Sequence, residues 1–274
     1  RRISDAIMEL ARHRHLSHIN LRHYQAVYLL AYYPLYVEMT SKILEEVSQN
    51  LYPAFPQTRR FQACFLGGGP APEAVALSTY FREYGFKGQS LTAHTFDIAA
   101  MTWKRSREIT KYLVSNLAPE IQFSLHGHTL NLCQRNALPQ LRDIIQTSEL
   151  FIVQNCLNEF VSTPQVFVEN IDFLVQEMPS SSILIVADLN YEIVRDLMRR
   201  IESCLIKRPN LHVIRSHTAG GHRLRTKIPL PRVIAKNLLI SGGILTPKTW
   251  VNFNYLAIQK LPIALQSDYA SLPY

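Results

Sequence analysis

The feature that most constrains the fold is the stretch FQACFLGGGPAPEAVALSTYF, which covers residues 61–81. An apolar run leads into three consecutive glycines, and a proline and an amphipathic segment follow them. Glycine adopts backbone angles that other residues avoid, and it lets another group approach the main chain closely. The stretch therefore predicts a strand, a tight loop and a helix. Either a ligand or another part of the fold then packs against the loop.

From Phe61 onward the chain alternates between strand-like and helix-like segments. Helices are expected at residues 72–84, 101–117, 135–147, 164–178 and 191–206. Apolar runs such as LFIVQN and SILIVAD show little alternation, which is typical of parallel strands covered on both faces. The strands are expected at QACFLG, SLTAHTFDI, IQFSLHGH, LFIVQNCL, SILIVADL, LHVIRSH and WVNFNYLAIQKL.

This alternation predicts an α/β fold with a Rossmann-like, mostly parallel sheet of seven strands. No clear helix separates the last two strands, which are joined by the basic segment 217–248. An antiparallel hairpin at one sheet edge is therefore expected at the C-terminal end.

The N-terminal residues have a different hydrophobic pattern, without strand-like segments. The segments ISDAIMELARH and YVEMTSKILEEVSQNLY repeat apolar residues at helical spacing, and Pro53 and Pro56 then indicate a linker. The chain is therefore expected to divide into an N-terminal helical cap at residues 1–56 and an α/β domain at residues 57–274.

Composition favours a soluble globular protein, since 47% of the 274 residues are apolar and 18% are charged. The longest apolar segment is broken by Pro34 and Glu38, so no membrane-spanning helix is expected. Four scattered cysteines predict free thiols, and with no signal peptide visible they indicate a cytoplasmic location. The chain begins with Arg1, so a trimmed leader stays possible. His126 and His128 have no acidic or cysteine cluster beside them, so no metal is predicted.

The positive charge is concentrated in the C-terminal part of the chain. The net charge is +8, and no acidic residue occurs between Glu202 and Asp268. Such a surface is typical of proteins that bind polyanions, which favours RNA as a partner. A basic face exposed only to solvent is the alternative. The cations are Lys207, Arg208, Arg215, Arg223, Arg225, Lys227, Arg232, Lys236, Lys248 and Lys260.

In open α/β sheets, ligands bind at the carboxyl ends of the strands, which is where residues 67–70 are expected. The sequence FLGGGPAPEA resembles the first motif of class I S-adenosylmethionine-dependent methyltransferases, and the resemblance extends over about residues 61–261. It implies S-adenosyl-L-methionine as the cofactor. It also implies that the loop Gly67, Gly68, Gly69 and Pro70 contacts it.

The same resemblance assigns roles at the ends of the next strands. Asp97 corresponds to the acid that hydrogen-bonds the ribose hydroxyls, and Ile98 would lie against the adenine. His128 and Thr129 stand where the family holds the adenine edge, and Asn155 where it approaches the methionine part.

The sequence also departs from the family pattern. Phe65 stands where the family usually carries an acid, and Ala71 replaces the third glycine. Glu73 is a candidate to supply the missing negative charge. The fourth-strand motif QNCLNEF is neither N-P-P-Y nor D-P-P-Y, so methylation of exocyclic amines is not indicated.

For catalysis we expect Glu159 to act as the base, with Asn158 beside it. Tyr33 belongs to an aromatic cluster that is either core or a lid over the pocket that binds substrate. The basic residues Arg223, Arg225 and Lys227 are expected to bind substrate phosphates.

RNA is the favoured acceptor of the methyl group. LLAYYPLYVEM followed by GGGPAPEAVAL also resembles, more weakly, ribosomal-RNA methyltransferase-like proteins with an N-terminal helical cap. Two alternatives stay open, a small-molecule methyltransferase and a non-catalytic binding or assembly factor with this fold. A nicotinamide-dependent dehydrogenase is disfavoured because Pro72 stands at the last glycine of its fingerprint.

Overall fold

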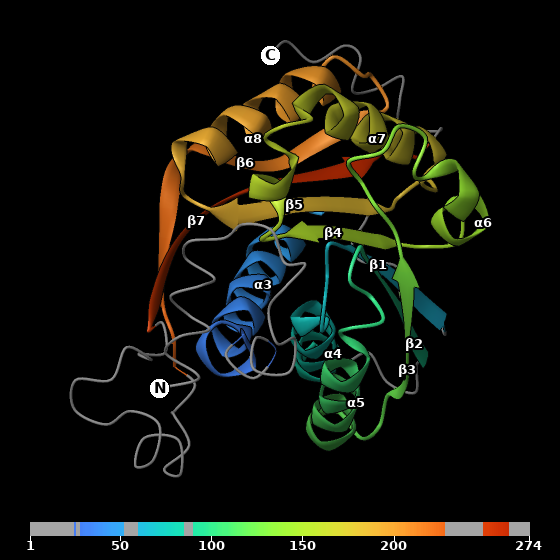
Figure 1. The fold of residues 1–274 in the computed structure, drawn as a ribbon, viewed down its shortest axis with the longest axis vertical. Coiled ribbons are helices and arrows are strands. Elements are labelled where there is room, and N and C mark those ends of the chain that lie inside the picture. The colour runs from blue at the N-terminus through green and yellow to red at the C-terminus, as the bar shows by residue number, and fades with distance from the viewer. Residues whose placement is uncertain (1–24, 26–27, 52–59, 85–89, 228–248, 263–274) are drawn as a thin grey trace.

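One sheet of seven strands, in the order β3-β2-β1-β4-β5-β7-β6, forms the centre of the molecule (Figure 1). The computed structural model describes residues 25, 28–51, 60–84, 90–227 and 249–262. The first predicted helix, the linker prolines and residues 228–248 of the basic segment 217–248 lie outside the described residues. The strands are β1 (Arg60–Leu66), β2 (Ser90–Asp97), β3 (Gln122–Thr129), β4 (Leu150–Gln154), β5 (Ile183–Leu189), β6 (Leu211–Arg225) and β7 (Trp250–Lys260).

Strands β1 to β5 run parallel to one another, and β7 pairs antiparallel with both β5 and β6. The predicted Rossmann-like sheet with a C-terminal antiparallel hairpin is therefore confirmed. The sequence did not indicate that β7 inserts between β5 and β6, which makes β6 the edge strand on that side of the sheet.

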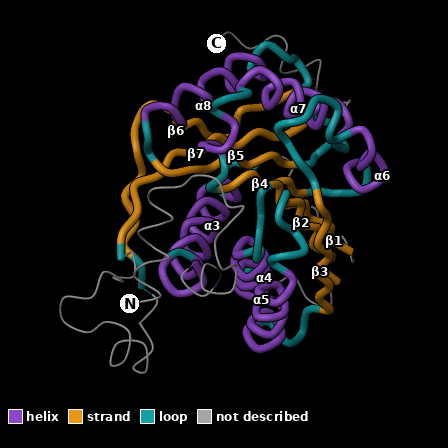
Figure 2. The backbone as a smooth tube through the Cα atoms, in the orientation of Figure 1, coloured by secondary structure: helices purple, strands orange, loops and turns teal. Residues whose placement is uncertain are grey.

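Helices cover both faces of the sheet (Figures 1 and 2). One face carries α3 (Tyr33–Ser48), α4 (Pro72–Glu83) and α5 (Lys104–Leu117). The other carries α6 (Arg142–Ile145), α7 (Pro164–Glu177) and α8 (Glu192–Leu205). Two short 3₁₀ turns are η2 (Pro139–Leu141) and η3 (Leu157–Phe160).

Successive side chains of a strand point to opposite faces of the sheet. Because helices cover both faces, the side chains on both sides of the central strands are buried. Ile152 of β4 packs into the core beneath α3 and α4, whereas its neighbours Phe151 and Val153 pack beneath α7 and α8. Helix α3 shares the first of these cores through Leu35, Met39, Ile43, Leu44 and Val47.

Two sequence predictions needed correction. The helix expected at 135–147 is reduced to η2 and the single turn α6, because Asn136 has a left-handed φ of 56° and Pro139 starts a new turn. The strand expected to end at His217 continues to Arg225 past Gly220 and Gly221, which form a bulge and not a turn. Within the described residues, none of the helices has the length and apolar character needed to cross a membrane.

Candidate functional site

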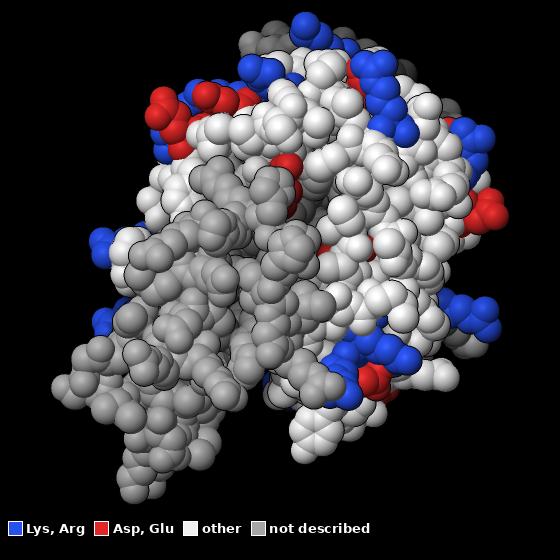
Figure 3. All heavy atoms as spheres, viewed as in Figure 1, with Lys and Arg blue, Asp and Glu red and all other residues white. Residues whose placement is uncertain are grey.

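A pocket of about 540 Å³ opens at the carboxyl ends of β1, β2 and β4. Its walls come from the loops that follow these strands, from the segment after β3 and from Trp103 before α5. Figure 3 shows a hollow in this face of the molecule, with acidic side-chain atoms visible in and beside it. This position is where open α/β sheets bind their ligands.

The three glycines serve the fold and the pocket in different ways. Gly67 has a φ of 70°, and a Cβ there would lie 2.5 Å from the Sγ atom of Cys156. A Cβ on Gly68 would lie 2.7 Å from the Cβ of Phe65, so Gly68 is required by packing and does not line the pocket. Gly69, with a φ of 44°, lines the pocket between Trp103 and Asp97.

Ala71 occupies a backbone conformation that favours glycine. Its φ is 62° and its ψ 58°, and it is the N-cap of α4. A left-handed non-glycine residue costs roughly 1–2 kcal/mol. The alanine that replaces the third glycine of the motif therefore keeps a backbone conformation that favours glycine.

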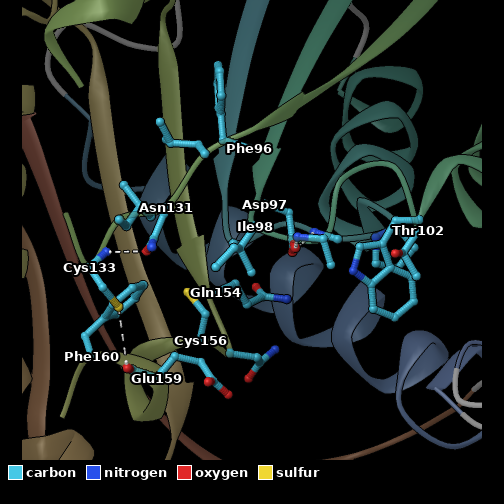
Figure 4. A pocket seen from close by; sticks show the side chains of 18 of the residues that line it. Phe96, Asp97, Ile98, Thr102, Asn131, Cys133, Gln154, Cys156, Glu159 and Phe160 are labelled. Carbon is cyan, nitrogen blue, oxygen red and sulfur yellow. Dashed lines mark hydrogen bonds between the residues drawn. The ribbon is translucent and has the colours of Figure 1, made fainter. Parts of the chain in front are cut away.

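Asp97 ends β2 and its carboxylate faces the pocket (Figure 4). One oxygen, Oδ2, accepts the N–H of Gly69 at 3.1 Å, and Oδ1 accepts the N–H of Ala99 at 2.7 Å. Burial raises the pKa of Asp97, while these two N–H groups and the charge of Arg107 act in the opposite direction. Each oxygen keeps a lone pair available for a further donor.

Two further predicted residues line the pocket beside Asp97. Ile98 follows it with 63% of its surface exposed, which is unusual for an isoleucine. Pro70 contributes to the loop side of the pocket. The aromatic wall is formed by Trp103 and Tyr28, whose ring centroids are 5.2 Å apart.

Asn155 follows β4 and lines the pocket with a φ of 57°. Both polar atoms of its side-chain amide are buried, and neither has a hydrogen-bond partner among the described residues. An unpaired buried amide costs roughly 1–3 kcal/mol.

Glu159 lines the pocket from η3, and Asn158 donates its Nδ2–H to Glu159 Oε1 at 3.3 Å without lining the pocket itself. The turn is held by Asp188, a residue that the sequence analysis did not single out. Its Oδ2 accepts the N–H of Leu157 at 2.7 Å, and burial raises the pKa of Asp188 to about 7.

The structure places several predicted site residues away from the pocket. The Nε2 atom of His128 lies 3.0 Å from Nδ1 of His94, and the His128 ring stacks on Phe96. Thr129 is exposed at the end of β3. The positions that do line the pocket come just after them, from Leu130 to Cys133.

Tyr33 and Glu73 also lie outside the pocket lining. Tyr33 is buried against Thr110, with a distance of 2.6 Å between the two hydroxyl oxygens. Glu73 is buried on the first turn of α4, and burial raises its pKa to about 8. Glu73 is therefore mostly neutral at pH 7, which does not fit the role of a replacement negative charge.

Gln154 was also missed by the sequence analysis. It is the last residue of β4, it lines the pocket, and its Oε1 accepts the hydroxyl of Thr40 on α3 at 2.7 Å. No local pattern distinguishes it from the other buried residues of its strand.

Together these features define a Rossmann-like α/β protein with a pocket at the carboxyl edge of its sheet. This is the architecture that the resemblance to class I S-adenosylmethionine-dependent methyltransferases implied.

No family model matches the sequence, and no curated protein sequence matches it either. Among solved structures, the chain is similar to an rRNA methylase from Streptococcus thermophilus, with 12% identity, a TM-score of 0.38 and coverage of 80% of this chain and 93% of that one. NodS from Bradyrhizobium japonicum, an N-methyltransferase solved with S-adenosyl-L-homocysteine, is 10% identical, with a TM-score of 0.44 and coverage of 81% and 86%.

TrmN from Thermus thermophilus is also 10% identical, with a TM-score of 0.44, and the match covers 81% of this chain but 48% of that one. All three TM-scores lie below 0.5. The description of the fold therefore rests on the strand order and register of this chain itself.

Proposed function

We propose that the pocket binds S-adenosylmethionine and that the protein transfers its methyl group to an acceptor. The observation that carries this proposal is the carboxylate of Asp97. It sits beside Gly69 with each oxygen fixed by one backbone N–H group. A fixed carboxylate accepts two neighbouring hydroxyl donors well, as the ribose of the cofactor offers them.

The other pocket residues fit the remaining parts of the cofactor. Ile98 offers an exposed apolar surface to an adenine ring, and Gly69 leaves room beside Trp103. The unpaired amide of Asn155 suits the charged amino and carboxyl groups of the methionine part. When bound, S-adenosylmethionine supplies an electrophilic methyl group.

The protein's own contribution to catalysis is alignment of the reactants and removal of a proton. Glu159 faces the pocket from η3 and can accept a proton from an O–H or N–H acceptor. Asp188 fixes the backbone of that turn through Leu157, so we assign it a positioning role.

Calorimetric titration of S-adenosylmethionine, with NADH titrated separately, tests the proposal. We expect binding of the first compound only, and its loss in Asp97→Ala. Asp196→Ala is the matched control, because Asp196 is an exposed acid on α8 whose ion pair with Arg199 is local. Absence of binding by either compound would favour a non-catalytic role of the fold.

For the acceptor, we propose RNA. Strand β7 is antiparallel to both β5 and β6. The end of β6 and the start of β7 therefore extend beyond the carboxyl end of β5, at the edge of the sheet where the pocket opens (Figure 1). Arg223 stacks over Trp250 at 5.1 Å, and 55% of Trp250 is exposed. Stacked aromatic and guanidinium groups bind unpaired bases. Arg225 and Lys227 continue the exposed basic surface.

Binding of a fluorescent single-stranded RNA at several salt concentrations tests this second proposal. We expect affinity to fall with salt, since phosphate contacts release counterions. Trp250→Ala should weaken binding about 5- to 100-fold. Affinity without salt dependence, or unchanged in Trp250→Ala, would favour a small-molecule acceptor.

A further inference from the structure

A second cluster of polar side chains lies where α3 packs against β6 and β7, and none of its residues lines the pocket. It consists of Glu46 on α3 and of His217 and His222 on β6. One carboxylate oxygen and one ring nitrogen from each histidine lie within 4.8 Å of one another.

The two histidines meet because β6 contains a bulge. His217 is paired with Tyr255 and His222 with Phe253, so residues 218–221 of β6 stand opposite Asn254 alone. In a regular strand, side chains five positions apart point to opposite faces of the sheet. Here the excursion brings both rings to the same face, with centroids 4.0 Å apart and planes at 89°. Bulges of this kind often re-aim side chains at functional sites.

His222 has an unused ring nitrogen. Its Nε2 atom is buried and has no hydrogen-bond partner within the part of the chain that the structure describes. The ring packs between Phe253 and Tyr255, at centroid distances of 5.5 and 5.3 Å. Such a buried nitrogen is unfavourable without a partner, and a ligand that accepts its lone pair would remove this cost.

Glu46 is already oriented toward the histidines. Tyr255 donates its hydroxyl to Glu46 Oε2, and the Lys42 ammonium lies 3.2 Å from Oε1. A hydrogen bond from a second residue to a liganding carboxylate is typical of metal sites, because it fixes the orientation of the ligand.

Two neighbours compete with a cation: Lys42 for the carboxylate of Glu46, and Arg215 for the ring of His217. Arg215 donates its Nε–H to Nε2 of His217 at 2.9 Å. Arg215 is exposed, so its side chain can move into solvent when that nitrogen is needed.

We propose that Glu46, His217 and His222 form a binding site for one divalent transition-metal ion of the zinc type. Two imidazoles and a carboxylate are a ligand set that zinc uses, with a fourth position left for water. Imidazole nitrogen suits zinc better than calcium or magnesium. The ion would tie α3 to β6, and α3 in turn holds the pocket residue Gln154 through Thr40. This inference is independent of the proposed methyl transfer.

The test uses the full chain, freed of metal with a chelator and titrated with Co²⁺ and then with Zn²⁺. Co²⁺ bound at a four-coordinate site is expected to absorb strongly in the visible range, and Zn²⁺ should abolish that signal. The signal and one equivalent of bound Zn²⁺ should be lost in His217→Ala and His222→Ala. His126→Ala is the matched control, since His126 is an exposed strand histidine.

Glu46→Gln keeps the shape of the side chain, so it tests the site even if a histidine variant folds poorly. It should weaken Zn²⁺ binding about tenfold or more, since a charged ligand is lost. Histidines 13, 15, 18 and 23 lie outside the described residues, and any binding by them should persist in all of these variants. Equal stoichiometry in the wild type and in the three site variants, or no binding at all, would overturn the proposal.

Arg215→Ala distinguishes metal binding at His217 from metal binding elsewhere on the protein. It removes both a competing hydrogen bond and a nearby positive charge, so Zn²⁺ should bind about 3- to 10-fold more tightly. Unchanged or weaker affinity in Arg215→Ala would contradict the assignment of His217 as a ligand.

Discussion

The carboxylate of Asp97 accepts the backbone N–H of Gly69 across 3.1 Å, which joins the end of β2 to the glycine loop after β1. One residue therefore both shapes the loop and offers its remaining lone pairs to the pocket. Asp97→Ala should lower the affinity for S-adenosylmethionine about 10- to 150-fold, the equivalent of about 1.5–3 kcal/mol for a charged hydrogen bond.

Asp97→Asn keeps one acceptor oxygen and nearly the same shape, so its loss of affinity should be smaller. Calorimetry of both variants, with circular dichroism as a check on folding, measures the difference. Equal affinity in Asp97→Ala and the wild type would remove Asp97 from the site.

The glycine loop offers a matched pair of substitutions. Gly67→Ala should destabilise the protein by about 2–4 kcal/mol, because strain at a positive φ adds to overpacking. The new Cβ would lie 2.8 Å from the Cβ of Cys156. Gly69→Ala meets no atom nearer than 3.3 Å, so about 1–2 kcal/mol of backbone strain is expected. Urea denaturation measures both, and a larger loss in Gly69→Ala would be inconsistent with this geometry.

Ala71 tests how far the departure from the family's glycine matters. Ala71→Gly relieves about 1–2 kcal/mol of left-handed strain but loses a buried methyl group and gains chain entropy when unfolded. These effects nearly cancel, so the unfolding free energy should change by less than about 1 kcal/mol. Ala71→Val adds a branched side chain at the same angles, and a loss above about 2 kcal/mol is expected.

These loop residues also show how much of the site could be predicted from the sequence. The resemblance pointed to Gly67, Gly69, Asp97 and Asn155, which line the pocket, because glycine runs and strand ends are local signals that one sequence carries. Gln154 and Asp188 were missed because their roles depend on partners on α3 and η3 that are distant in the chain.

The places of His128 and Thr129 have a similar cause. The resemblance pointed to them because the strand was expected to end at His128, but β3 continues to Thr129 and the pocket lining begins at Leu130. The glycine pair at 220–221 was interpreted as part of a loop, since nothing in the local sequence separates a turn from a bulge that pairing with β7 stabilises.

Asn155 should show a trade between stability and binding. Asn155→Gly retains the positive φ and removes the unpaired amide. The free energy of unfolding without cofactor should therefore stay within about 1 kcal/mol of the wild-type value. Affinity for S-adenosylmethionine should fall in the same variant. Thermal unfolding with and without the cofactor measures both effects. A variant that is clearly destabilised but binds normally would show that the amide serves the fold.

The buried Glu73 predicts a dependence of stability on pH. Its pKa is raised from the ordinary value of 4.5 to about 8 by burial, so the folded state holds a proton that the unfolded state releases. The contribution of Glu73 to the free energy of unfolding is therefore fully present below about pH 4.5 and is lost as the pH rises through about 8. Glu73→Gln should reduce this loss. Denaturation at pH 5 and pH 9 measures it, and identical slopes for the two proteins would contradict a buried, neutral Glu73.

The position of β7 between β5 and β6 has a consequence for synthesis on the ribosome. Strand β6 leaves the ribosome before β7, but its only neighbour in the sheet is β7. The hydroxyl of Tyr255 on β7 also bonds to Glu46, 209 residues earlier in the chain. Such distant pairings form slowly. The edge of β5 that pairs with β7 therefore stays uncovered, with apolar surface exposed, until β7 has emerged. This interval is when the nascent protein is most exposed to aggregation and to chaperones.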